Sequence, residues 1–148
     1  MSESNFRVKQ IDHVEVIVPD QYQAAEWYRL VFGLQIMEDF EFWAADGPLM
    51  ISSDGGHTKL ALFQGDPPGF SQPVGFQRVA FQVDDQGFMT FLRRLEQHPV
   101  FDHDGREVHV LQVIDHDLSY SLYFCDPYGN RYEVTTYDYE SVRAKLNT

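Results

Sequence analysis

Residues 11–20 read IDHVEVIVPD, and residues 76–85 read FQRVAFQVDD. The two stretches align at a constant offset, with apolar side chains at matching positions. Within each stretch apolar and polar side chains alternate, which is typical of a β-strand with one buried face. Each ends in an aspartate, Asp20 or Asp85, that we expect to cap a following helix. The chain therefore contains an internal repeat, and this repeat predicts its fold.

Each copy of the repeat continues into a helix and then into strand-like segments. Apolar residues at helical spacing follow both aspartates, and Gly33 closes the first helix. Turn-forming residues then separate three strand-like segments in each half, at 34–43, 49–53 and 58–64 and again at 107–114, 119–125 and 131–137.

This order predicts an α+β fold of two βαβββ modules, paired around one curved sheet cleft within a single domain, residues 1–148. Module one spans about residues 8–65, a linker about 65–75, module two about 76–137, and a C-terminal helix about 138–148.

Charge and composition exclude several functions. The 148 residues carry 23 acidic and 11 basic side chains, a net charge of −12 at pH 7. Nucleic acids and anionic membranes are bound through clustered Lys and Arg, so we expect neither as a partner. The single cysteine, Cys125, excludes an internal disulfide and fits a reducing compartment. Because no targeting segment or apolar stretch of membrane-spanning length is visible, we expect a cytoplasmic protein.

The alternation also predicts which side chains point away from the core. The outward positions of the strands carry both polar and aromatic groups, and aromatic residues at 40, 42 and 43 fall in the strand predicted at 34–43. Aromatic walls beside Glu15 and Glu41 would suit a planar or cationic organic ligand. We expect the ligand cleft to be lined by His13, Glu15, Phe42, Phe63, Arg78 and Glu133.

Residues 122–133 read LYFCDPYGNRYE, two strand segments joined by a tight turn. This run resembles the strand–DPxGN–strand motif of the vicinal oxygen chelate superfamily, which groups glyoxalases, bleomycin-resistance proteins and extradiol dioxygenases. The resemblance covers about residues 8–137. It implies paired βαβββ modules and commonly a homodimer. It also implies a divalent metal, such as Fe or Mn, held by a His on the first strand, a His on the fifth and a Glu on the eighth.

His13 and Glu133 stand at two of these three ligand positions. Arg78 stands where the second His is expected, and Ala61 stands at the fourth-strand position from which glyoxalases add a ligand. A guanidinium keeps its proton and cannot ligate a cation. We therefore expect Arg78 to pair with Glu133 in a degenerate site that needs no cofactor. If a metal binds, the resemblance makes His13 and Glu133 its protein ligands.

His116 and Tyr123 form a second candidate group. Their spacing to the DPYGN turn is similar to the extradiol-dioxygenase signature, in which the His is an acid/base beside bound oxygen and the Tyr helps to orient the substrate. Histidine suits acid/base work because its ordinary pKa is close to neutral. The simpler interpretation of His116 is a turn residue, and His103 and His109 are expected to be solvated.

Three functions remain open on these residues. The first is a binding protein of the bleomycin-resistance type, for a small aromatic or cationic organic molecule and without a metal. The second is a metal-dependent enzyme, best represented by dioxygenase-like ring cleavage. The third is a metal-free lyase or isomerase in which Glu133 or His13 is the base and Arg78 stabilises an enolate. Arg78 favours the first function and opposes the second, so we prefer the binding protein.

Overall fold

The computed structural model describes residues 6–71 and 77–148. The chain divides into two compact units, Met1–Asp66 and Pro67–Thr148, which are described in turn. The predicted linker at about 65–75, and Phe76 at the start of the second repeat, lie partly outside the described residues. No helix within the described ranges is long and apolar enough to cross a membrane.

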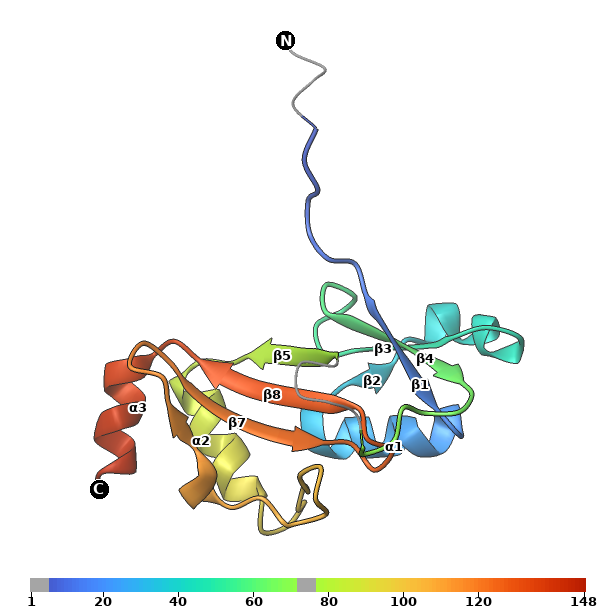
Figure 1. Cartoon of the computed structure of the whole chain (residues 1–148). Helices are drawn as coiled ribbons and strands as arrows, with labels where there is room; N and C mark the ends of the chain where they lie inside the picture. The colour runs from blue at the N-terminus through green and yellow to red at the C-terminus, as the bar shows by residue number, and fades with distance from the viewer. Residues whose placement is uncertain (1–5, 72–76) are drawn as a thin grey trace. The chain divides into compact units, whose positions relative to one another are not determined.

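The first unit contains one four-stranded sheet with the strand order β1-β4-β3-β2 (Figure 1). Strands β1 and β4 pair in parallel, whereas β3 pairs antiparallel with both β4 and β2. The elements are β1 (Val14–Val18), α1 (Gln21–Phe32), β2 (Gln35–Ile36), the 3-10 helix η1 (Glu38–Ala45), β3 (Leu49–Ser52) and β4 (Lys59–Gln64).

The second unit repeats this arrangement, with the strand order β5-β8-β7-β6 (Figure 1). Strands β5 and β8 pair in parallel, and β7 pairs antiparallel with both β8 and β6. The predicted α+β class and the two βαβββ modules are confirmed. The elements are β5 (Arg78–Gln82), α2 (Asp85–Arg94), the 3-10 helix η2 (Val110–Gln112), β6 (Ile114–Asp115), β7 (Tyr120–Cys125), β8 (Arg131–Thr136) and α3 (Tyr139–Leu146).

The local sequence signals explain the first strand and helix. Val16 and Val18 are buried while Glu15 is exposed, as the alternation predicts. The Asp20 carboxylate accepts a hydrogen bond from Gln23 N (2.9 Å) and so satisfies an N–H group that the helix itself leaves unbonded. Gly33 ends α1 with φ 71°, a left-handed conformation that glycine adopts without a steric penalty.

The second helix starts one residue earlier than predicted. Its cap is Asp84, whose side chain accepts from Gly87 N at 2.7 Å, and not Asp85. Asp85 instead lies in the first turn and accepts hydrogen bonds from Ser141 and Lys145 of α3. These contacts lower the pKa of Asp85 to about 2, first through Ser141 and then through Lys145. The C-terminal helix predicted at about 138–148 is therefore joined to α2 by a carboxylate.

Two of the predicted strands are wrong over most of their length. The segment 34–43 pairs as a strand only at β2, and Phe40 N then donates to Met37 O at 3.1 Å as the chain winds into η1. Acidic side chains in the first turn of η1 favour a helix start there. In the segment 107–114 only the end belongs to β6, because His109 N donates to the Gln112 side chain at 2.7 Å and closes η2.

The turn between β7 and β8 is built around the buried Asp126 carboxylate. Its Oδ1 accepts from Tyr128 N (2.9 Å) and Asn130 N (2.8 Å), and its Oδ2 accepts from Asn130 Nδ2 (2.8 Å). Gly129 adopts φ 99° and is packed against the backbone of Gly69. The DPYGN sequence therefore fixes how β7 lies against β8.

Candidate functional site

The strand register places several candidate residues on one face of the second sheet. Strand β8 lies between β5 and β7, so one residue from each strand forms a row across the sheet. Side chains in register on neighbouring strands point to the same face. We call this face, which carries Arg78, Tyr123 and Glu133, the Arg78 face. Its rows are Arg78–Arg131–Cys125, Ala80–Glu133–Tyr123 and Gln82–Thr135–Ser121.

Only part of the Arg78 face is open to solvent. Arg78 is exposed, and Tyr123 and Glu133 are half-buried. Arg131 and Thr135, which the alternation also places outward, are buried at 7% exposure each. The prediction of the face is therefore correct, but its accessible part is confined to the β5 side and the middle row.

Arg78 lies against the ring of Tyr123. The guanidinium carbon is 4.8 Å from the ring centroid, which is the geometry of a cation–π contact. At the other end of the same ring, the Tyr123 hydroxyl lies 2.9 Å from His116 Nε2. Burial raises the pKa of Tyr123, and the negative charge of Glu133 raises it further. Two side chains from different segments thus hold this tyrosine in one orientation.

Glu133 has a different partner from the one that the sequence suggests. Its Oε2 accepts a hydrogen bond from the buried hydroxyl of Ser121 at 2.7 Å. Ser121 Oγ also lies 2.9 Å from Thr135 Oγ1. The ion pair expected between Arg78 and Glu133 is not formed. Arg78 lies in the row next to Glu133, a diagonal position that its long side chain could reach. Glu133 instead accepts from the nearer Ser121 hydroxyl, and Arg78 lies against Tyr123.

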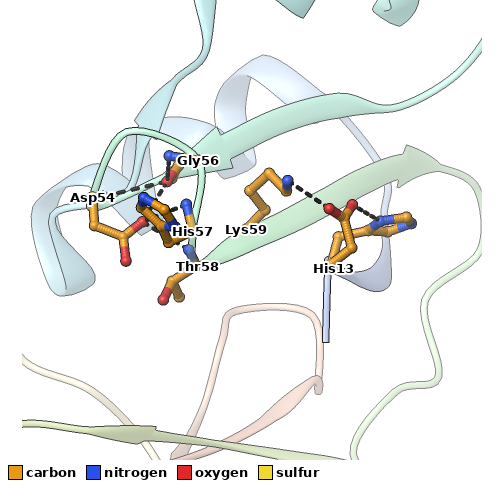
Figure 2. Close-up of polar contacts among 8 residues, drawn as sticks. His13, Asp54, Gly56, His57, Thr58 and Lys59 are labelled. Atoms are coloured by element: carbon orange, nitrogen blue, oxygen red, sulfur yellow. Dashed lines mark hydrogen bonds and ion pairs between the residues drawn. The ribbon is translucent and has the colours of Figure 1, made fainter. Parts of the chain in front are cut away.

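In the first unit, His13 is surrounded by acidic groups. Its Nδ1 lies 2.8 Å from Asp12 Oδ2, and its Nε2 lies 3.5 Å from Glu15 Oε2. Lys59 donates to the other oxygen of Asp12 at 2.9 Å. Figure 2 draws this contact between Lys59 and His13 as a dashed line to an unlabelled carboxylate. These contacts lower the pKa of Asp12, first through Lys59 and then through His13. Both imidazole nitrogens of His13 therefore face carboxylates of its own strand segment.

The β3–β4 turn leads directly to Lys59 and has its own hydrogen-bond network. Asp54 Oδ1 accepts from His57 N (3.0 Å) and Thr58 N (2.7 Å), and Ser52 Oγ accepts from Gly56 N (2.9 Å), as seen in Figure 2. The bond from Thr58 is the main cause that lowers the pKa of Asp54 to about 2. The sequence signals this turn through its Asp-Gly-Gly run, but not the network.

The aromatic residues expected in the cleft are divided among different elements. Phe63 is half-buried on β4, in register with Ile17 of β1. Phe42 lies in η1 with 73% of its surface exposed, so its predicted place on a strand is wrong. Its ring centroid is 6.0 Å from that of Trp43. A cleft shared by the two modules stays a prediction.

The side chains present do not fit the three-ligand metal site that the resemblance implies. Residues 6–71 and 77–148 contain no group of three or more His, Cys, Asp or Glu side chains placed to hold an ion. At the second ligand position Arg78 brings a fixed positive charge, which repels a cation. His13 and Glu133 belong to different units, and their role as metal ligands stays untested.

Comparison with family models identifies one family. A family model described as the Glyoxalase/Bleomycin resistance protein/Dioxygenase superfamily matches residues 10–134. A search of curated proteins found no match.

Three solved structures illustrate the shared fold. The fosfomycin resistance protein FosX from Listeria monocytogenes is 15% identical, with 92% of this chain and 99% of that chain covered and a TM-score of 0.64. A glyoxalase/dioxygenase from Nostoc punctiforme is 19% identical, with 92% and 94% covered and a TM-score of 0.65. Oxidase ChaP-H2 is 20% identical, with 92% and 99% covered and a TM-score of 0.63. At these identities the likeness shows the fold alone.

Proposed function

Because the chain belongs to the Glyoxalase/Bleomycin resistance protein/Dioxygenase superfamily, which matches residues 10–134, we propose that it is a small-molecule-binding protein whose ligand lies on the Arg78 face. The observation that carries this proposal is the exposed guanidinium of Arg78 held over the half-buried ring of Tyr123. Such a pair offers a ligand a flat surface and fixed hydrogen-bond donors, and it does so without a metal.

The face favours an aromatic ligand over a cationic one. The Tyr123 ring is oriented by Arg78 on one side and by His116 at its hydroxyl, so little conformational entropy is lost when a planar molecule packs beside it. A cationic ligand would meet the like charge of Arg78. Of the two ligand classes expected from the sequence, the aromatic class therefore fits these groups better.

Calorimetric titration with a neutral planar probe, 2-naphthamide, tests this proposal. We expect measurable binding to the native protein and a loss of affinity in Tyr123→Ala. The matched control is Tyr137→Ala, which removes an exposed tyrosine of the same unit and should bind as the native protein does. If neither 2-naphthamide nor its charged analogues bind at millimolar concentration, the proposal is wrong. Equal losses of affinity in the two variants would show that the binding site does not lie on the Arg78 face.

A metal-dependent, dioxygenase-like enzyme is the second candidate, because His116 and Tyr123 contact each other at 2.9 Å. These are the two residues that the resemblance assigns to acid/base work and substrate orientation. The fixed charge of Arg78 at a ligand position opposes this candidate. Elemental analysis after purification without chelators, followed by assays on catechols after addition of Fe(II), separates the two functions. Bound iron or manganese together with ring cleavage would favour the enzyme, and His116→Gln should then abolish turnover while His109→Gln should not.

A further inference from the structure

The Arg78 face carries two arginines within an acidic protein. The chain carries a net charge of −12, yet Arg78 and Arg131 lie side by side in one row of the face. At the end of that row lies the thiol of Cys125, whose pKa burial raises; Arg131 and Arg78 act against that rise, and Asp126 and Asp102 add to it. Glu133 supplies the carboxylate of the neighbouring row. Arg131 is buried and has an interaction of its own, so the exposed cation of these two is Arg78.

The Glu133 carboxylate forms no ion pair with Arg78. Glu133 accepts its hydrogen bond from Ser121, and among residues 6–71 and 77–148 no Asp or Glu oxygen forms an ion pair with Arg78. The contact with Tyr123 places the guanidinium carbon over the ring and is no ion pair. The planar fork of donors thus remains available at an exposed position.

A planar fork of N–H donors matches a carboxylate better than any other common organic group. Two parallel N–H···O bonds form at once, and both partners are charged. The ring of Tyr123 limits the orientations of the guanidinium, so less side-chain entropy is lost when the pair forms. An aromatic acid bound in this way would have its carboxylate in the plane of the guanidinium.

We propose that the ligand of the Arg78 face is an aromatic carboxylate, bound through its carboxylate by the guanidinium of Arg78. This inference rests on the proposed function and assigns the chemical class of its ligand. The charge of the protein as a whole works against anions, so a preference for an anion would have to arise locally at this face.

Three probes of one shape and different charge test the inference by calorimetric titration: 2-naphthoate is an anion, 2-naphthamide is neutral and 2-naphthamidinium is a cation. We expect 2-naphthoate to bind about tenfold more tightly than 2-naphthamide, which corresponds to one charge-assisted contact. Arg78→Ala should abolish this preference, while Arg78→Lys, which keeps the charge and loses the fork, should retain part of it. Arg106→Ala removes another exposed arginine of the same unit and should leave the preference unchanged.

The outcomes separate the inference from the function on which it rests. If 2-naphthamide binds as tightly as 2-naphthoate, or if Arg78→Ala keeps the preference, the carboxylate assignment is wrong while the binding function stands. If 2-naphthamidinium binds more tightly than 2-naphthoate, the face prefers a cation and the carboxylate assignment is wrong. If no probe binds, both the inference and the proposed function fail. Circular dichroism and thermal unfolding of each variant verify that it is folded before its affinity is compared.

Discussion

Gly129 lies in the turn that sets β8 against β7, and replacing it by alanine is the sharpest test of how this unit is built. The residue adopts φ 99°, where an L side chain is strained. An added Cβ would also collide with the Cα, carbonyl carbon and carbonyl oxygen of Gly69. Backbone atoms cannot rotate away as a flexible side chain can, so the β7–β8 turn and the backbone at Gly69 would have to move apart.

The loss of stability in Gly129→Ala has two parts, the strained backbone and the collision with Gly69. A left-handed alanine costs about 1–2 kcal/mol, and forcing an extra carbon into a packed place costs about 1–3 kcal/mol more. Gly105 provides the matched control in the same unit. It also has a positive φ, 77°, but nothing lies within 4 Å of an added Cβ. Gly105→Ala should therefore lower the free energy of unfolding by the first term only, and Gly129→Ala by the sum.

Urea titration and thermal unfolding of both variants measure the difference. For a chain of this length, each kcal/mol shifts Tm by about 2–4 °C, so Gly129→Ala should melt about 2–12 °C below Gly105→Ala. The same displacement should weaken binding of 2-naphthoate, because Tyr123 lies on β7 and its row partner Glu133 on β8. Equal destabilisation by the two variants would refute the close approach of Gly129 to Gly69.

Two carboxylates and one thiol give three further expectations. Ser141 is the main cause that lowers the pKa of Asp85 from 3.8 to about 2. The Asp85 carboxylate therefore stabilises the fold fully above pH 3.8, and this stabilisation is lost as the pH falls toward 2. In Ser141→Ala, acid unfolding curves should show a smaller loss of stability over this range. Asp54→Ala should speed amide hydrogen exchange at residues 57 and 58, and unchanged protection would contradict the turn network. Burial raises the pKa of the Cys125 thiol, so disulfide reagents near neutral pH should label it only on unfolding; rapid labelling of the native protein would contradict its burial.

Local signals in the sequence account for most of the fold. The alternation around Val16, the cap at Asp20 and the glycine at 33 each act over a few residues, so they can be recognised without knowing their neighbours. The segment 34–43 fails for a physical reason. Its alternation is interrupted at residues 37–39, which read Met-Glu-Asp, and the acidic residues in the first turn of η1 favour a helical turn over a strand. Sequence alone therefore predicts the modules better than it predicts their edge strands.

The candidate site shows where this kind of prediction ends. Alternation gives the face of a side chain, and it correctly puts Arg78, Tyr123 and Glu133 together. It does not give the row, because the row depends on the register between strands that are far apart in the sequence. Ser121, the actual partner of Glu133, could be found only once this register was known.

The partner of Arg78 is decided by small energies. An exposed cation–π contact is worth about 0.5–1 kcal/mol, and an exposed ion pair about 0–1 kcal/mol. These two alternatives for Arg78 are nearly equal. The bond from the buried Ser121 hydroxyl to Glu133 changes the balance, because it satisfies the carboxylate with a short side chain that has little rotamer entropy to lose. Ser121 thus keeps Arg78 available for a ligand.

Ser121→Ala should therefore lower the affinity for the ligand indirectly, through Glu133 and Arg78. Without its donor, Glu133 becomes a competitor for Arg78, and the affinity for 2-naphthoate should fall about threefold, the equivalent of one exposed ion pair. Adding Glu133→Gln to this variant removes the competing charge and should restore the affinity, which a merely structural defect at Ser121 would not allow. Calorimetric titration of the single and double variants measures both effects. If Ser121→Ala binds 2-naphthoate as the native protein does, or if the affinity of the double variant stays low, Ser121 does not keep Arg78 available for the ligand.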